Sequence, residues 1–153
     1  QHPSLIVPLN QSFPHIPSGP SKNATAGPHI SSILNFDIPA SAVNKTCAFW
    51  FFFPNETQID PSSFVYSGEE EHLFRFFMLE EPAMANTSLG NAPYVKYRLA
   101  EKVLIPGDDQ MVEAIDCPAG ETMGILWEGV SDSYLSYTEN YAPCPIGLFI
   151  DIG

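Results

Sequence analysis

The chain has 153 residues, which suits a single domain that can bury a substantial apolar core without a metal or a disulfide framework. Hydrophobic residues make up 44% of it and charged residues only 16%, a low charge content that favours short strands and ordered loops. The net charge of −12 excludes nucleic acids and anionic membrane surfaces as partners, because both are bound by clustered lysine and arginine and the chain has only 6 basic residues.

No part of the sequence holds the roughly 20 consecutive apolar residues that a membrane-spanning helix needs. The chain opens with Gln1-His2-Pro3, as a mature chain does once a signal peptide has been removed. We therefore expect a secreted, extracellular protein that does not bind a membrane.

Residues 1–28 are rich in proline, serine, asparagine and glycine, and they predict an extended N-terminal arm. Its one short apolar run, Leu5–Val7, could add an edge strand to a sheet. Residues 29–153 predict the folded domain. The first clear signal in this domain is residues 31–38, where apolar and polar side chains alternate as in a strand with one buried face.

An aromatic run over Thr46–Phe53 predicts a central strand packed on both faces, with Trp50 in the core. Further strands are predicted at residues 64–66, 73–79, 94–99, 102–105, 110–115, 122–128 and 146–152. Pro106–Asp109 has the composition of a hairpin turn, and residues 131–141 predict a loop with room for one strand. With about nine or ten short strands and no helical periodicity, the sequence predicts an all-β fold, a single antiparallel β-sandwich of the jelly-roll kind.

Glycosylation motifs are the strongest functional signal. Five of the eight asparagines lie in the acceptor pattern Asn-X-Ser/Thr, where chance would place about one. These acceptors are Asn10, Asn23, Asn44, Asn55 and Asn86. Each lies in a polar or turn-like segment, so we expect an N-glycosylated protein that has passed through a secretory pathway.

Three cysteines permit one disulfide bond and leave one thiol, and an oxidising compartment favours the bond. The four histidines are isolated from one another and from the cysteines. We therefore expect no metal site and no cofactor.

The preferred function is non-catalytic binding of a cell-wall or extracellular polysaccharide. Exposed aromatic rings stack on the apolar faces of sugars, and Trp127, Tyr134, Tyr137 and Tyr141 are the candidate rings, with Tyr94 and Tyr97 on another strand. Ordinary core packing is the alternative for each of them.

A polysaccharide-acting hydrolase is a second hypothesis. It would need two carboxylates roughly 5–10 Å apart, one of them with a raised pKa. Asp37 is the first candidate, with Glu128 or Asp151 as its partner. The alternative is that these side chains point into solvent, or that Asp37 pairs with Arg75 across neighbouring strands. A third hypothesis is an extracellular protein-interaction module, and in either binding role we expect a monomer without catalytic residues.

Several short segments, in order, resemble a fungal family of secreted proteins that is named for homology to the C-terminal domain of a ubiquitin-three-binding protein. The matching segments are Phe36-Asp37-Ile38-Pro39-Ala40, Lys45-Thr46-Cys47, Phe53-Pro54, Asn91-Ala92-Pro93, Pro106-Gly107, Cys117-Pro118-Ala119-Gly120 and Pro145-Ile146-Gly147-Leu148. They extend from about residue 30 to the C-terminus. The resemblance implies a β-sandwich with no catalytic residues to carry over, and it implies a Cys47–Cys117 bond that leaves Cys144 as the extra thiol. The family name suggests a partner inside the cell, which the five acceptor sites argue against.

Overall fold

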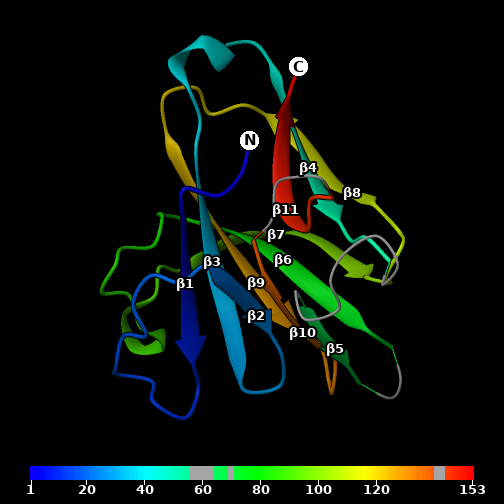
Figure 1. The fold of residues 1–153 in the computed structure, drawn as a ribbon. Coiled ribbons are helices and arrows are strands. Elements are labelled where there is room, and N and C mark those ends of the chain that lie inside the picture. Colours follow the sequence, from blue (N-terminus) through cyan, green and yellow to red (C-terminus); the bar gives the residue numbers. More distant parts are fainter. Residues whose placement is uncertain (56–63, 69–70, 140–143) are drawn as a thin grey trace.

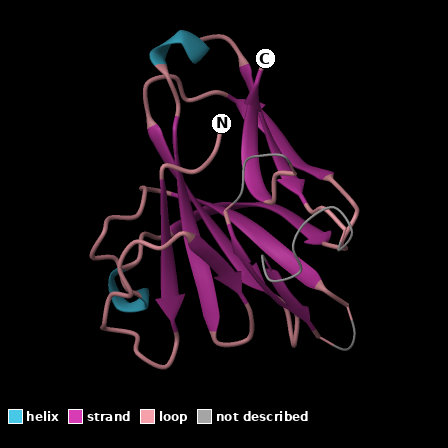
Figure 2. Ribbon diagram, in the orientation of Figure 1, coloured by secondary structure: helices cyan, strands magenta, loops and turns pink. Residues whose placement is uncertain are grey.

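The computed structural model describes residues 1–55, 64–68, 71–139 and 144–153. Within these ranges the chain forms eleven strands and two single-turn 3-10 helices, so the predicted all-β fold is confirmed (Figure 2). The strands are β1 (Leu5–Asn10), β2 (Asn23–Ala26), β3 (Ile30–Asp37), β4 (Thr46–Phe52), β5 (Phe64–Ser67), β6 (Leu73–Leu79), β7 (Val95–Val103), β8 (Gln110–Asp116), β9 (Thr122–Gly129), β10 (Tyr134–Thr138) and β11 (Gly147–Ile152). The helices are η1 (Ala40–Ala42) and η3 (Leu89–Asn91).

The strands form three antiparallel sheets. A five-stranded sheet has the order β1-β3-β9-β6-β7, and two three-stranded sheets have the orders β2-β10-β5 and β11-β4-β8 (Figure 1). Every pairing is antiparallel. The five-stranded sheet is one layer of a β-sandwich, and the two smaller sheets contribute to the same apolar core from its other side.

The core is rich in aromatic rings, as the 11 phenylalanines of the chain suggest. The ring of Phe51 on β4 lies 5.7 Å from that of Trp127 on β9, 6.3 Å from Phe76 on β6 and 5.8 Å from Tyr137 on β10. Such edge-on and tilted contacts are favourable because the positive ring edge meets a negative ring face. One ring therefore connects all three sheets.

The aromatic run does form a central strand, since β4 pairs with β11 on one side and β8 on the other. Its alternate residues Cys47, Phe49 and Phe51 are fully buried in the core. The prediction that both faces are packed, with Trp50 in the core, is wrong. Trp50 and Phe52 point to the outer face of this sheet and are only half-buried, because no further layer covers it in the described part of the chain.

A disulfide bond joins Cys47 to Cys117, across 70 residues of sequence. It connects the start of β4 to the segment that follows β8, where the amide of Cys117 also donates to the carbonyl of Lys45 at 3.0 Å. The pairing that the family resemblance implied is therefore confirmed.

Two features of the β7 region differ from the prediction. The strands predicted at 94–99 and 102–105 are one strand, β7, interrupted by two irregularities in its register with β6. The Pro106–Asp109 turn does not close a hairpin: β7 and β8 lie in different sheets, so the turn carries the chain from one layer to the other. Turn composition indicates a reversal but does not reveal whether the next strand pairs with the last.

The N-terminal residues contribute strands to both layers. β1 pairs with β3 at the edge of the five-stranded sheet, as its apolar run suggested. β2 pairs with β10 in a smaller sheet and was not predicted, because its buried residues are only alanines and a threonine. The domain boundary at residue 28 stays a prediction.

Candidate functional site

The outer face of the five-stranded sheet carries a second, smaller apolar cluster. Successive strand residues point to opposite faces, so Leu34 of β3 packs in the main core while Ile33 points outward. Ile33 is nevertheless fully buried, together with Val7, Leu9 and Leu79 from neighbouring strands. A segment of the chain must therefore cover this face.

The covering segment is the loop of residues 80–94, drawn in green at the left of Figure 1. Asn35 fastens it: its Nδ2 donates to the carbonyl of Ala83 at 2.8 Å, and its Oδ1 accepts from the amide of Ala83 at 2.9 Å. Both bonds are buried. The side-chain amide thus imitates the backbone of a neighbouring strand and fixes the loop to the sheet.

Two glycines allow the loop to approach closely. A Cβ at Gly124 of β9 would lie 3.0 Å from the carbonyl oxygen of Glu81 and 3.0 Å from the Cα of Pro82. The amide of Gly90, in η3, donates to the carbonyl of Pro14 at 2.6 Å. The loop is therefore held from the sheet beneath it and from the N-terminal segment beside it.

A groove of about 830 Å³ remains between the loop and the sheet. Ile33 and Leu126 form part of its floor, and residues 89–95 form its wall. Its rim is apolar and open to solvent: Leu89, Tyr94 and Val95 are all exposed. We call this feature the loop groove.

Carboxylates give the loop groove a negative potential. Glu80, Glu81 and Glu128 all line it. Burial raises the pKa of Glu128 above its ordinary value of 4.5, and the nearby Arg75 guanidinium opposes part of this shift. Glu128 faces Arg75 directly across the β6–β9 pairing, so the charge at this end of the groove is partly balanced.

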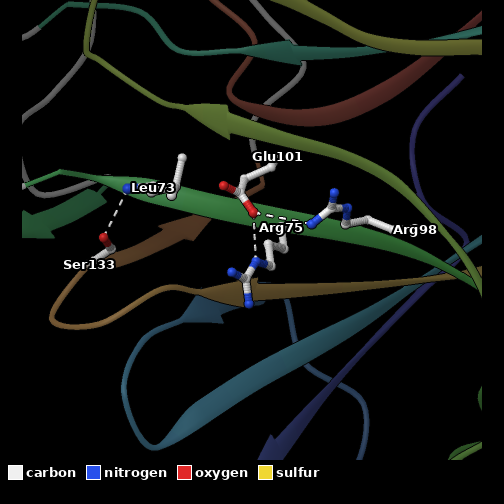
Figure 3. Close-up of polar contacts among 5 residues, drawn as sticks. All are labelled: Leu73, Arg75, Arg98, Glu101 and Ser133. Carbon is white, nitrogen blue, oxygen red and sulfur yellow. Dashed lines mark hydrogen bonds and ion pairs between the residues drawn. The ribbon is translucent and has the colours of Figure 1, made fainter.

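A charged cluster continues from Arg75 away from the groove (Figure 3). Arg75 Nε donates to Glu101 Oε2 at 2.7 Å, and Arg98 Nη1 donates to the same oxygen at 3.4 Å. The hydrogen bond from Arg75 lowers the pKa of Glu101. Because all three side chains are largely solvated, we assign them little stability and regard them as a polar border to the groove.

Two of the aromatic rings predicted to bind sugar are buried in the core. Trp127 is 1% exposed and Tyr137 2%, and both are packed around Phe51 in the core, so that prediction is wrong for these two rings. Their strands alternate, and the alternation places these residues on the inner face. Tyr134 is half-buried against Gly27, and Tyr141 lies outside the described residues.

Two of the predicted catalytic carboxylates, Asp37 and Glu128, are not brought together. Asp37 is exposed at the end of β3, where its Oδ1 accepts from Thr122 at 2.7 Å. Glu128 lies six residues farther along β9 than Thr122, which is about 20 Å at the rise of a β-strand. Asp151 is exposed on β11 in the other layer. The Asp37–Glu128 pair is too far apart for a glycosidase mechanism.

A bare aromatic surface lies on the outer face of the β11-β4-β8 sheet. The rings of Trp50 and Phe52 are 6.3 Å apart and nearly parallel, at 8°, and Phe149 lies 5.3 Å from Phe52. These three half-buried rings line a shallow hollow with Asp151 at its edge. We call it the aromatic face.

The acceptor asparagines lie at the surface. Asn23, Asn44, Asn55 and Asn86 are exposed, and Asn10 is half-exposed at the end of β1. The described part of the chain contains no helix with the length and hydropathy of a membrane span. Within the same residues, no three histidine, cysteine or carboxylate side chains gather as a metal site.

Residues 1–143 match the family described as Ubiquitin 3 binding protein But2 C-terminal domain. The chain belongs to this family. The match includes β1 and β2 as well as β3 to β10, and it ends before β11. Among curated proteins, none matches the chain.

One of the segments by which the chain resembles the But2 family, Asn91-Ala92-Pro93, lines the loop groove. Sequence reasoning did not identify the groove itself. Two signals were present: a buried amide, Asn35, in an otherwise apolar strand, and the Leu89–Val95 stretch with apolar residues at exposed positions. Neither could be interpreted without knowing that the loop returns to the outer face.

Proposed function

We propose that this domain is a non-catalytic protein-interaction module, and that the loop groove is its docking site for a partner protein with a basic surface. The observation that carries the proposal is the position of Asn91-Ala92-Pro93, one of the segments by which the chain resembles the But2 family, in the wall of the groove. The description of that family names a ubiquitin 3 binding protein, which is itself a protein-binding role.

The apolar rim supports a protein partner. Tyr94 is 81% exposed, although an aromatic side chain of this size usually loses most of its surface to water on folding. Leu89 and Val95 beside it are also exposed. Exposed apolar side chains around a preformed groove are typical of protein interfaces, where tyrosine often provides a large share of the binding free energy.

The charges support a basic partner. Glu80, Glu81 and Glu128 line the groove, and the chain as a whole carries a net charge of −12. A partner that presents lysine or arginine around an apolar patch would be attracted from a distance and would find carboxylates near its cations on docking. Binding should therefore weaken as the salt concentration rises.

The test uses two substitutions in the same loop. Tyr94 lines the groove, whereas Met84 does not line it and is 69% exposed, so Met84→Ala is a matched control for Tyr94→Ala. A photo-crosslinking amino acid at either position in the full chain would capture extracellular proteins from the natural source. Each captured protein is then identified, purified and titrated against both variants by calorimetry, with purified ubiquitin 3 as a second probe.

We expect the crosslink at position 94 alone, and a loss of affinity of at least about tenfold for Tyr94→Ala with little change for Met84→Ala. If ubiquitin 3 binds and loses affinity only for Tyr94→Ala, the partner is ubiquitin-like. If only a captured protein shows this pattern, the partner is extracellular. The docking site is refuted if no probe binds, or if both substitutions have the same effect.

A further inference from the structure

The five acceptor asparagines are not used by the loop groove and call for a separate explanation. We propose that the chain is N-glycosylated at these asparagines in a secretory compartment, and that Asn23 and Asn86 are modified efficiently only before the domain folds. This inference does not depend on the proposed function, because it concerns other side chains.

Two of the acceptor asparagines form hydrogen bonds through the oxygen of the side-chain amide. Asn10 Oδ1 accepts from the amide of Ser12 at 2.9 Å. Asn23 Oδ1 accepts from the hydroxyl of Thr138 at 2.7 Å. Both bonds orient the side chain without engaging Nδ2, which is the atom that carries an N-linked glycan.

The two asparagines outside acceptor sites that the structure describes behave differently. Asn35 donates Nδ2 to the carbonyl of Ala83 at 2.8 Å, and Asn91 donates Nδ2 to the carbonyl of Asn86 at 3.4 Å. In these two residues the amide nitrogen is part of the fold. The contrast is between Asn35 and Asn91, whose Nδ2 holds the fold together, and Asn10 and Asn23, which are oriented through Oδ1 instead.

The modification is a simple group transfer. A new bond forms between Nδ2 and the anomeric carbon of an oligosaccharide carried on a lipid diphosphate. The bond between that carbon and the diphosphate oxygen breaks, and the lipid diphosphate leaves with the electron pair of that bond. The amide loses one proton, which passes to solvent or to the departing diphosphate. No electron transfer is required, and the lipid-linked oligosaccharide is the one co-substrate.

The glycosylating enzyme recognises the acceptor pattern through the hydroxyl group two residues after the asparagine. In the folded domain some of these hydroxyl groups are exposed and others are buried. Ser12 and Thr46, which belong to the sites at Asn10 and Asn44, are exposed. Thr25 and Ser88, which belong to the sites at Asn23 and Asn86, are only 8% and 4% exposed.

Specific contacts hold both buried hydroxyls. Thr25 Oγ1 lies 2.7 Å from Ser136 Oγ, on the strand that pairs with β2. The Ser88 hydroxyl accepts from the backbone amide of Asn91, and the Asn91 side chain accepts in return from the amide of Ser88 at 2.7 Å. An enzyme could reach either hydroxyl only after part of the domain had opened.

The first experiment examines the protein purified from the extracellular fluid of its natural source. An N-glycanase in heavy-oxygen water converts each glycosylated asparagine to an aspartate that carries one heavy oxygen, and peptide mass spectrometry locates the label. We expect label at acceptor asparagines and none at Asn35 or Asn91. Absence of label from all five acceptors would overturn the proposal.

The second experiment tests the effect of folding. Unglycosylated protein, folded with its disulfide intact, is incubated with an oligosaccharyltransferase and the lipid-linked donor, beside the same chain unfolded and reduced. In the folded protein we expect Asn23 and Asn86 to be modified at least about tenfold more slowly than Asn10 and Asn44, because modification waits for local opening. In the unfolded chain this difference should disappear. If Asn23 and Asn86 in the folded protein were modified as fast as Asn10 and Asn44, the proposal that they are modified before folding would be refuted.

Discussion

The two outer faces of the sandwich begin from the same sequence pattern and end differently. On both, apolar side chains occupy the outward positions of a central strand: Ile33 on β3 and Trp50 on β4. The chain returns over the first face, so Ile33 is fully buried and a second cluster of apolar residues forms. The aromatic face has no such cover among the described residues. Whether an outward-facing apolar residue is buried or exposed therefore depends on whether a loop far away in the sequence covers it.

The largest expected effect compares one residue from each face. Ile33→Ala should lower the free energy of unfolding by about 3 kcal/mol, because it removes a fully buried side chain beneath the loop. Phe149→Ala on the aromatic face should lower it by only about 1 kcal/mol, since the ring is half-exposed. Denaturant titration of both variants measures the difference. Equal losses would mean that the aromatic face is as well packed as the loop-covered face.

The loop attachment itself is the next target. Asn35→Ala should lower the free energy of unfolding by about 2 kcal/mol, because it leaves the buried amide and carbonyl of Ala83 without partners unless the loop detaches. Hydrogen exchange should then rise over residues 80–94 and stay unchanged on the aromatic face. Asp37→Asn, at an exposed position on the same strand, is the control and should leave exchange unaltered.

A smaller effect is expected where the loop passes over β9. Gly124→Ala places a methyl group 3.0 Å from backbone atoms of Glu81 and Pro82, so the loop must shift by a few tenths of an ångström. We expect a loss of about 1 kcal/mol and a change in the affinity of the loop groove for its partner. Unchanged stability and affinity together would show that the loop tolerates displacement.

The smallest expected effect is a pH dependence at the charged end of the groove. Burial raises the pKa of Glu128, so the folded domain binds this proton more tightly than the unfolded chain does. The protonated Glu128 side chain contributes its full stabilisation at pH values below the ordinary pKa of 4.5. This stabilisation is lost as the pH rises through the raised pKa of Glu128 in the folded domain. Glu128→Gln should therefore flatten the decline in stability across that range, measured by thermal unfolding at several pH values. A parallel decline in both proteins would assign it to other groups.

The strands were largely predictable because alternation and turn residues are local properties. The run from Leu73 to Leu79 predicts β6 to the residue, whereas β2 was missed because its burial depends on small side chains. The site was less predictable. Trp127 and Trp50 are both tryptophans in strands, and only the register and the layers place the first inside and the second outside. The pairing of Asn35 with Ala83 depends on a contact across 48 residues, which no local pattern reveals.

The Cys47–Cys117 bond also has a mechanical consequence. It ties the centre of one sheet to the end of β8 and encloses β5, β6 and β7 in a covalent loop. If the domain is stretched from its two ends, tension bypasses the 70 residues between the cysteines, which withholds roughly 240 Å of extended chain. An oxidised molecule would yield under force first in the strands that lie outside the covalent loop, while β6 and β7, which carry the polar border of the loop groove, would remain under no direct load.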